Sequence, residues 1–354
     1  MQKTMLAFFV FAAGMLAQQR GVTGTFTFFT VPGAGYGTYP VGINAAGVVA
    51  GWFGVTGGSR GFVRSASGAI HEFEVPGADG TWPAGINESG TTTGYYTQAE
   101  SSPYRGFVRT ADGAIVTFAA PGAGTALFQG TRGVSVNAAG DVAGYYIDAN
   151  NADHGFVRTA SGDLIAFDAP GAGTVALQGT QALSINTAGT IAGFYADASY
   201  AFHGFVRAAS GAITTFDAPG AGTGDGQGTA AFSINAAGTI AGYYSDTIPV
   251  FRSFVRTADG VIATFDSPGA GTNAGQGTFG MSINTKGAIT GNYNNSGKYT
   301  DYGFVRSASG VITTFAAPYA VQGTFPASIN DAGVIAGYGY DTGTDHTVGF
   351  LLAP

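Results

Sequence analysis

Four aspartates recur at one position of a repeated pattern in this chain of 354 residues. Each lies eleven residues after the asparagine of a recurring Asn-x-x-Gly string, and they are Asp148, Asp197, Asp246 and Asp341. Asn295 and Gln98 occupy the same position in two further copies. A ring of carboxylates could bind cations or polar sugars. The alternative is local, because an aspartate at a strand end accepts hydrogen bonds from the next backbone amides in an Asx-turn.

Five glutamines form a second set, and each opens a Gln-Gly-Thr string. They are Gln129, Gln178, Gln227, Gln276 and Gln322. Their amides could line the mouth of a central channel and hold a polar ligand, or they could tie down the preceding loop, since buried polar groups are normally paired. Tyr146 and Tyr244 lie two residues before two of the aspartates. The aspartates, glutamines and tyrosines together are the candidate binding residues.

A catalytic interpretation needs a carboxylate, tyrosine or histidine cluster at one place. A polysaccharide lyase or hydrolase could draw on Tyr145, Tyr146, Tyr243, Tyr244, Asp148, Asp246 and His154. Most of these positions repeat between copies, whereas a catalytic site needs one copy unlike its neighbours. The four histidines show no metal-ligand spacing and cysteine is absent. We therefore expect no metal site and no cofactor, and we find no convincing catalytic motif.

A third recurring position is an arginine that ends a Gly-Phe-Val-Arg string, in Arg64, Arg109, Arg158, Arg207, Arg256 and Arg306. Its regularity predicts a stacked, partly buried structural side chain, because arginine stems lie along apolar surface. A fourth position follows the phenylalanine of a Thr-Phe-Asp-Ala-Pro-like string. It is acidic in Glu74, Asp168, Asp217 and Asp266 and is Ala or Thr elsewhere. This pattern predicts a turn-forming residue.

The elements that must position these residues follow from a sevenfold repeat. The phenylalanine of Gly-Phe-Val-Arg recurs at intervals of 45, 49, 49, 49, 50 and 46 residues. The fifth copy has four runs rich in Ile, Val, Phe, Tyr and Thr, at residues 227–235, 240–244, 254–256 and 264–268. Turn residues separate them, so they predict four antiparallel strands. Seven such units predict an all-β, seven-bladed β-propeller with four antiparallel strands in each blade.

Two observations favour a closed propeller over an open solenoid. Ile213 and Phe216 are three residues apart in a fourth strand, hence on opposite faces, and both faces must be buried. The repeats also begin with a lone fourth strand at 25–29 and end with a set of first, second and third strands at 324–352. We expect the N-terminal strand to join the last blade and close the ring, which would remove exposed sheet edges.

The loops indicate which face binds a ligand. Turns between first and second strands are nearly uniform, whereas loops between second and third strands vary in length and content. Because functional residues concentrate in variable loops, we expect the ligand on the face that carries those loops and the loops from the fourth strand to the next first strand.

Composition excludes several classes of protein. The chain has 60 glycines, 45% apolar residues and 10% charged residues, with 27 Phe and 17 Tyr. Glycine on this scale is too costly for helices, and the aromatic content is too high for a disordered chain. The net charge is −7, and six of the 14 Lys and Arg are the repeated arginine. No basic patch remains for phosphates, so nucleic acid is not an expected partner.

Residues 1–20 predict a secretory signal peptide, with Lys3 followed by an apolar run from Met5 to Leu16. The run is shorter than the ~20 residues that span a bilayer, so we expect no membrane span. Residues 21–354 would then form a single propeller domain. The expected location is secreted, either extracellular or periplasmic, and the expected state is a monomer.

The repeats resemble the HAF family of extracellular repeat proteins, named for a His-Ala-Phe string. The residues that carry the resemblance are His154-Gly155-Phe156 and His203-Gly204-Phe205, together with Thr-Phe-Asp-Ala-Pro-Gly-Ala-Gly-Thr and Ser-Ile-Asn-x-x-Gly-x-Ile-Ala-Gly-Tyr-Tyr strings. The likeness extends from about Thr25 to Leu352. It implies secretion and a repeat-built β fold, and no particular activity. This chain has Gly for the Ala, and Arg60, Arg105 or Arg252 where the His would fall.

The sequence therefore predicts a secreted β-propeller that acts as a binding or interaction module, with a glycan or an extracellular protein as its ligand. A polysaccharide-acting lyase or hydrolase is one alternative. A structural or adhesive surface protein is the other.

Overall fold

The computed structural model describes residues 24–99, 102–295, 301–318, 320–341, 343 and 346–354. Within these residues the chain forms strands β1 to β28 and no helix, which confirms the all-β class. The same residues therefore offer no helix that is long and apolar enough to cross a membrane. The predicted signal peptide at residues 1–20 lies outside the described part of the chain.

The strands form repeated antiparallel blades, and each blade contains an inner, a second, a third and an outer strand. The inner strands are β2 (Thr38–Ile43), β6 (Gly80–Ile86), β10 (Gly130–Val136), β14 (Gly179–Ile185), β18 (Gly228–Ile234), β22 (Gly277–Ile283) and β26 (Ala320–Ile329). The second strands are β3 (Val49–Val55), β7 (Thr92–Thr97), β11 (Val142–Ile147), β15 (Ile191–Ala196), β19 (Ile240–Ser245), β23 (Ile289–Asn294) and β27 (Ile335–Asp341).

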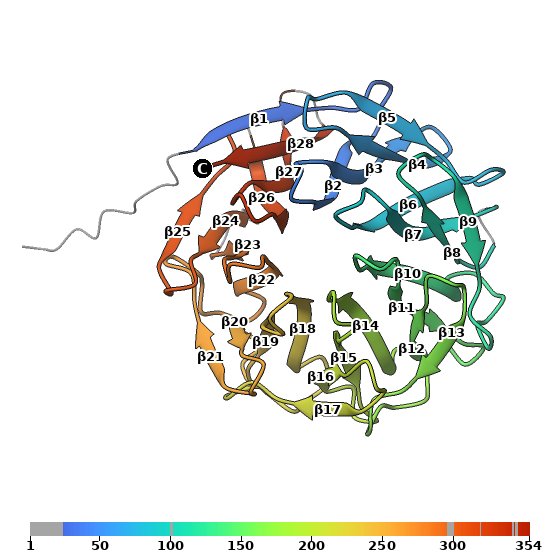
Figure 1. The fold of residues 1–354 in the computed structure, drawn as a ribbon. Helices are drawn as coiled ribbons and strands as arrows, with labels where there is room; N and C mark the ends of the chain where they lie inside the picture. The colour runs from blue at the N-terminus through green and yellow to red at the C-terminus, as the bar shows by residue number, and fades with distance from the viewer. Residues whose placement is uncertain (1–23, 100–101, 296–300, 319, 342, 344–345) are drawn as a thin grey trace, which may run out of the picture.

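The third strands are β4 (Gly58–Arg64), β8 (Arg105–Arg109), β12 (Asp153–Arg158), β16 (Phe202–Arg207), β20 (Phe251–Arg256), β24 (Asp301–Arg306) and β28 (His346–Ala353). The outer strands are β1 (Thr25–Phe29), β5 (Ile70–Phe73), β9 (Ile115–Phe118), β13 (Leu164–Phe167), β17 (Ile213–Phe216), β21 (Ile262–Phe265) and β25 (Ile312–Phe315). Figure 1 shows the blades side by side around a common centre, with the inner strands nearest to it and the outer strands at the rim.

The outer strand beside β28 comes from the other end of the described chain. β1 pairs antiparallel with β28, so that Thr25 lies opposite Ala353 and Phe28 opposite Phe350. The ring of Phe26 contacts that of Phe350, with centroids 5.5 Å apart at a steep angle. The set β26, β27, β28 and β1 therefore has the same strand order as the other blades.

The apolar core lies between neighbouring blades. Ile191 and Phe205 are fully buried in one blade, and Phe167 of the preceding blade and Ile213 pack against them. Phe216, three residues after Ile213, packs instead with the cluster of the following blade. Both faces of this outer strand are used, as its spacing predicts.

The recurring glycine of the third strand makes room for the phenylalanine of the outer strand. A Cβ atom at Gly204 would lie 2.6 Å from Cζ of Phe216, closer than real Cβ contacts allow. The fifth copy has Ser253 at this position, fully buried, and its hydroxyl donates to the Thr278 carbonyl at 3.1 Å. The glycine therefore lets the phenylalanine ring of the outer strand lie directly against the third strand, and in the fifth copy the serine hydroxyl has a hydrogen-bond partner.

The repeated arginine joins one blade to the blade before it. The guanidinium carbon of Arg207 lies 4.8 Å from the ring centroid of Phe167, and Arg64 lies 4.9 Å from that of Phe29. The same contact recurs for Arg109, Arg158, Arg256 and Arg306. Arg64 and Arg207 are buried. These contacts confirm the structural role that the regular spacing predicts.

The repeated asparagine joins the blades at the inner strands. Each side-chain amide donates to the backbone carbonyl of the next blade's asparagine, at 2.8–3.3 Å, in the order Asn44, Asn87, Asn137, Asn186, Asn235, Asn284 and Asn330. Asn330 donates in turn to the carbonyl of Asn44 at 3.0 Å. The side-chain oxygen of each accepts the backbone N–H four residues later, as in Asn186 and Thr190 at 3.0 Å. We call this set the asparagine ring.

Candidate functional site

The recurring aspartates hold the loops that follow the second strands. Oδ1 of Asp148 accepts the N–H groups of Asn150 and Ala152 at 2.8 and 2.9 Å. The same bonds form at Asp197 and Asp246, and Asp341 accepts the N–H of Gly343 at 2.8 Å. This is the Asx-turn geometry of the local alternative. One carboxylate oxygen of each aspartate is thus committed to its own turn.

The second oxygen of three aspartates faces a basic side chain of the adjacent third strand. Nε2 of His154 lies 3.6 Å from Asp148, and Nδ1 lies 3.0 Å from Asp168. His203 lies likewise between Asp197 and Asp217. Arg252 lies between Asp246 and Asp266. In these blades the basic side chain therefore bridges two carboxylates.

These ion pairs correct the role expected for the acidic residue after the outer-strand phenylalanine. Glu74 pairs with Arg60 at 3.1 Å, and Asp168, Asp217 and Asp266 pair as described, so pairing rather than turn formation explains the acid. A signal was present in the sequence. Each acid lies 14 residues after its His or Arg, whereas Tyr302 is followed at that spacing by Ala316.

The environment of the aspartates favours their charged form. Burial raises the pKa of Asp148, but the N–H groups of Ala152 and Asn150 and the hydrogen bond from His154 outweigh burial, so the pKa lies below its usual value. The same balance lowers the pKa of Asp197. The carboxylates of Asp148 and Asp197 are therefore ionised at neutral pH and already have partners.

The glutamines tie loops together at the same end of the molecule. Gln129 and Gln178 are buried. Gln129 accepts the N–H of Ala126 at 2.9 Å and donates to the side-chain oxygen of Asn151 at 3.0 Å. The others repeat part of this pattern: Gln178 donates to Ala198, Gln227 to Thr247, and Gln276 accepts from Asn273. The side chain of Gln322 lies outside the described part of the chain. These bonds show that the glutamines hold the loops in place, which is the alternative to ligand binding that the sequence left open.

The two candidate tyrosines lie in the core between blades. Tyr146 and Tyr244 are 8% and 4% exposed, and the ring of Tyr146 stacks on His154 with centroids 4.9 Å apart. Together with the aspartates and glutamines, they form separate clusters in different blades, with most polar atoms internally bonded.

A pocket at the loop end of the inner strands brings different residues together. The loop end is the side where the outer-to-inner loops and the second-to-third loops lie. A pocket of about 320 Å³ is lined there by Tyr39, Trp52, Phe325 and Tyr338, with Asn292 as a polar group. Tyr39 stacks on Trp52 with centroids 4.0 Å apart and meets Tyr338 edge to face. Repeat analysis missed this pocket, because Tyr39 and Phe325 lie at an inner-strand position that varies between copies, whereas Trp52 and Tyr338 lie at a second-strand position that is Tyr in most copies.

One junction between blades carries charge where the others are mostly aromatic. Arg132 donates to the hydroxyl of Tyr145 at 2.9 Å, and its guanidinium carbon lies 4.4 Å from the ring centroid of Tyr104. Asp153, 9% exposed, accepts a hydrogen bond from Gln181 at 2.6 Å. Burial raises the pKa of Asp153 to about 6, against opposing effects of Gln181 and Arg132. We call Arg132, Tyr145, Asp153 and Gln181 the charged junction.

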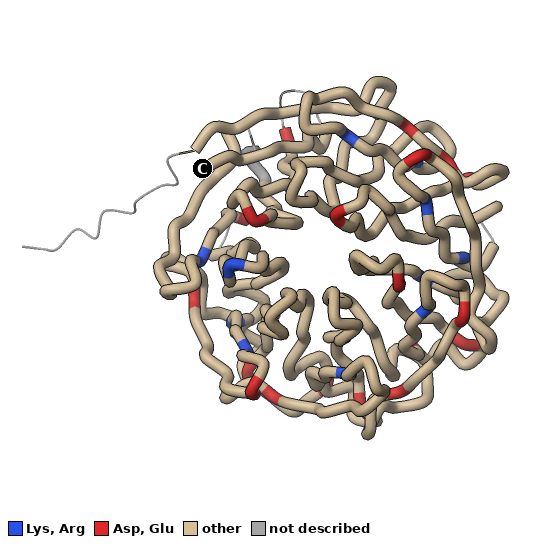
Figure 2. The backbone as a smooth tube through the Cα atoms, in the orientation of Figure 1, with Lys and Arg blue, Asp and Glu red and all other residues tan. Residues whose placement is uncertain are grey.

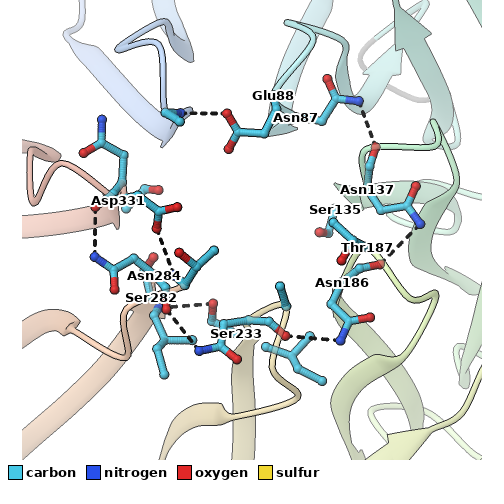
Figure 3. Close-up of a pocket in the computed structure, with 18 of the residues that line it drawn as sticks. Asn87, Glu88, Ser135, Asn137, Asn186, Thr187, Ser233, Ser282, Asn284 and Asp331 are labelled. Atoms are coloured by element: carbon cyan, nitrogen blue, oxygen red, sulfur yellow. Dashed lines mark hydrogen bonds between the residues drawn. The ribbon is translucent and has the colours of Figure 1, made fainter. Parts of the chain in front are cut away.

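A second cavity lies at the opposite, turn end of the inner strands. It has a volume of about 490 Å³ and is lined by the asparagine ring and by the residues next to it (Figure 3). The sequence favoured the loop end alone, whereas the structure has a cavity at each end. Charged residues are scattered around the molecule and gather on no one side (Figure 2). Among the described residues, no three His, Cys, Asp or Glu side chains are grouped so as to hold a metal ion.

Comparison with known proteins supports the fold. No protein-family model matches the chain, and no curated protein matches its sequence. A catalytically inactive virginiamycin B lyase from Staphylococcus aureus with quinupristin has a similar structure. Its TM-score is 0.60 at 14% identity, with 94% of this chain and 100% of that chain covered. A streptogramin B lyase gives 0.58 at 15% identity, over 93% and 98% of the two chains. The β-propeller domain of the trilobed protease from Pyrococcus furiosus gives 0.53 at 10%, over 90% and 94%. The described chain therefore has a propeller-like fold built of repeated antiparallel blades.

Proposed function

We propose that the chain is a secreted, monomeric seven-bladed β-propeller, closed by β1, that binds a carbohydrate or a similar polyhydroxylated ligand. The pairing of β1 with β28 and the hydrogen bond from Asn330 to Asn44 support closure. The apolar run in residues 1–20 supports secretion. The HAF-like strings are consistent with both.

The observation that carries the binding proposal is the aromatic pocket at the loop end. Ligand pockets are mostly apolar clefts with a few polar groups that fix orientation, and sizes of about 300–1,000 Å³ are usual. The pocket formed by Tyr39, Trp52 and Tyr338 has this character, and Asn292 provides an amide beside the rings. Flat aromatic faces suit the apolar face of a sugar ring, and tyrosine hydroxyls and the amide suit its hydroxyl groups.

In this proposal the aspartates act indirectly, by holding the loops near the pocket. Asp148, Asp197 and Asp246 fix the second-to-third loops through their turns, and those loops surround the loop end. Binding at the pocket would depend on these residues through loop position.

A glycan array with the purified protein tests the proposal, followed by titration of any hit by calorimetry. Trp52→Ala should weaken binding of the hit about fivefold or more, because an aromatic stacking partner contributes on the order of 1 kcal/mol or more. Trp82→Ala is the matched control. Trp82 belongs to the blade after that of Trp52, where it stacks on Tyr95, and it does not line the pocket. Equal loss in both variants, or no glycan hit, would contradict the proposal.

A lyase is the second candidate, and the charged junction favours it. Arg132 stands where other blades have Tyr39, Trp82, Gln181, Ala230, Phe279 or Phe325, so this blade is unlike its neighbours. The protonated form of Asp153 persists to about pH 6, and a raised carboxyl pKa is typical of acid–base groups. Two of the similar solved structures are named as lyases.

Parallel assays for reducing sugars and for unsaturated products test this second candidate on the same glycans. Turnover that is lost in Asp153→Asn and kept in Trp82→Ala would support it. Binding without turnover favours the binding module. A protein that neither binds nor turns over any glycan fits the structural or adhesive alternative.

A further inference from the structure

The cavity at the turn end is lined by one equivalent residue from each blade. This residue directly follows the ring asparagine, and the set is Ala45, Glu88, Ala138, Thr187, Ala236, Thr285 and Asp331. The backbone carbonyls and side chains of the asparagines are already bonded to one another. The backbone N–H groups of the residues that follow them are further polar groups of residues that line the cavity.

Two of these N–H groups bind a carboxylate of the protein itself. The N–H of Ala45 donates to Oε2 of Glu88 at 2.9 Å, and the N–H of Thr285 donates to Oδ1 of Asp331 at 2.9 Å (Figure 3). In both cases the carboxylate comes from the same position of the next blade. Two junctions between blades therefore already show a carboxylate held by the N–H group that follows a ring asparagine.

In the part of the chain that the structure describes, three consecutive blades have neither an acidic residue at this position nor a carboxylate bonded to its N–H group. The N–H groups of Ala138, Thr187 and Ala236 have no hydrogen-bond partner among the described residues. The next blade offers each of them only a Thr or an Ala side chain at the position that Glu88 and Asp331 occupy elsewhere. All three residues are exposed at the cavity.

We propose that the N–H groups of Ala138, Thr187 and Ala236 form a binding site for a carboxylate, supplied by a small organic acid or by the C terminus of a peptide. The ligand carboxylate takes the place that Glu88 and Asp331 take at the other junctions. Backbone N–H groups bind anions through charge-assisted hydrogen bonds without a basic side chain. Glu88, Asp331 and the net charge of −7 disfavour polyanions at this mouth. This site lies at the opposite end of the inner strands from the aromatic pocket and is independent of it.

NMR titration of the ¹⁵N-labelled protein at pH 7 tests the proposal. Propionate should shift the amide signals of Ala138, Thr187 and Ala236 in a saturable way, with a dissociation constant on the order of millimolar, and propionamide should not. A tripeptide with a free C terminus and its amidated form distinguish the two sources. Tighter binding of the free tripeptide than of propionate assigns the site to a peptide terminus, and the reverse assigns it to a small acid. If neither carboxylate shifts these amides, or propionamide shifts them equally, the proposal is wrong.

Two variants make the test specific. Thr187→Glu should place a carboxylate on the N–H of Ala138, as Glu88 does for Ala45, and weaken propionate binding about tenfold while raising the melting temperature. Ala139→Glu is the charge-matched control, because the N–H of Ala139 is already bonded to Asn137 at 3.0 Å. Glu88→Ala should free the N–H of Ala45 and add its amide signal to those that propionate shifts. Equal weakening in Thr187→Glu and Ala139→Glu would show a general charge effect and overturn the proposal.

Discussion

The side-chain amide of Asn330 donates to the backbone carbonyl of Asn44 at 3.0 Å, across 286 positions of the chain. The same bond joins Asn186 to Asn235 at 3.1 Å, across 49 positions. The local geometry of the two junctions is alike although one lies between neighbouring repeats and the other between distant ends. Contacts between blades therefore repeat as regularly as the strands within them.

This equivalence predicts equal costs for two substitutions. Asn330→Ala and Asn186→Ala each remove one donor to the next blade and one acceptor for their own turn. Each should lower the free energy of unfolding by about 1–3 kcal/mol, because a buried carbonyl loses its partner. Denaturant unfolding measures both. A loss in Asn186→Ala alone would mean that the junction between Asn330 and Asn44 does not form in solution.

Removal of the N-terminal strand should destabilise the last blade. Deleting residues 21–31 leaves β28 without its outer neighbour and uncovers Phe350 and Leu352, which are 0% and 1% exposed. We expect a loss of several kcal/mol, since removing one buried phenylalanine side chain costs about 3–5 kcal/mol. Thermal unfolding with size-exclusion chromatography is the measurement. A monomer with an unchanged melting temperature would show that β1 is dispensable.

The repeated arginine should matter through its ring contact. Arg207→Ala removes the guanidinium above Phe167 and its apolar stem, and should cost about 1–2 kcal/mol. Arg207→Lys should recover only part of this loss, since an ammonium group stacks less well on a ring. Arg105→Ala is the control, because Arg105 lies in a third strand but is exposed. Similar losses at Arg207 and Arg105 would argue against the stacking contribution.

The buried carboxyl of Asp153 predicts an unusual pH dependence. Its pKa of about 6 in the folded state lies above the ordinary value of 3.8, so the folded protein holds the proton more tightly than the unfolded chain does. Stability from this group is therefore greatest below pH 4 and falls by about 3 kcal/mol as the pH rises through 6. Asp153→Asn should remove this slope, so the variant gains stability over the wild type between pH 4 and pH 7.

Asp112 offers a control of opposite sign. The hydrogen bond from Thr110 lowers the pKa of Asp112, so its contribution is present above pH 4 and is lost as the pH falls. Asp112→Asn should therefore lower the free energy of unfolding by a constant amount between pH 4 and pH 7, and the difference from the wild type should vanish as the pH falls through the pKa of Asp112. A slope between pH 4 and pH 7 that persists in Asp153→Asn would assign the effect to another group.

Features within one repeat could be predicted from the sequence, whereas contacts between repeats could not. Regular spacing placed the strands, and Ile213 with Phe216 indicated burial on both sides. The asparagines could be recognised as turn residues, but their bonds to the next blade depend on how blades are placed in space. The pairs of Arg60 with Glu74 and of His154 with Asp168 could have been found, because an acid follows the His or Arg by 14 residues in four of the five copies that have one, the exception being Arg105 with Ala119.

The pockets were harder to predict for a different reason. Tyr39 and Arg132 share an inner-strand position that varies widely between copies, and a comparison of repeats gives weight to what the copies share. Trp52 replaces a tyrosine that four other copies have, and the position of Asp153 also varies, with a second aspartate at Asp301. The aspartates and glutamines were prominent because they recur, and recurrence in this chain marks residues that hold turns and loops.

Because Thr25 pairs with Ala353, the two ends of the described chain meet within one blade. The arrangement of the blades therefore does not depend on which turn the chain is opened in. Ala353 ends a third strand and Thr25 begins an outer strand. In the blade of β12 and β13, a short turn between Arg158 and Leu164 joins a third strand to an outer strand. A linker from Ala353 to Thr25 would recreate that turn. A circularly permuted chain, opened in any other turn of this kind, would then keep every strand neighbour and every contact between blades.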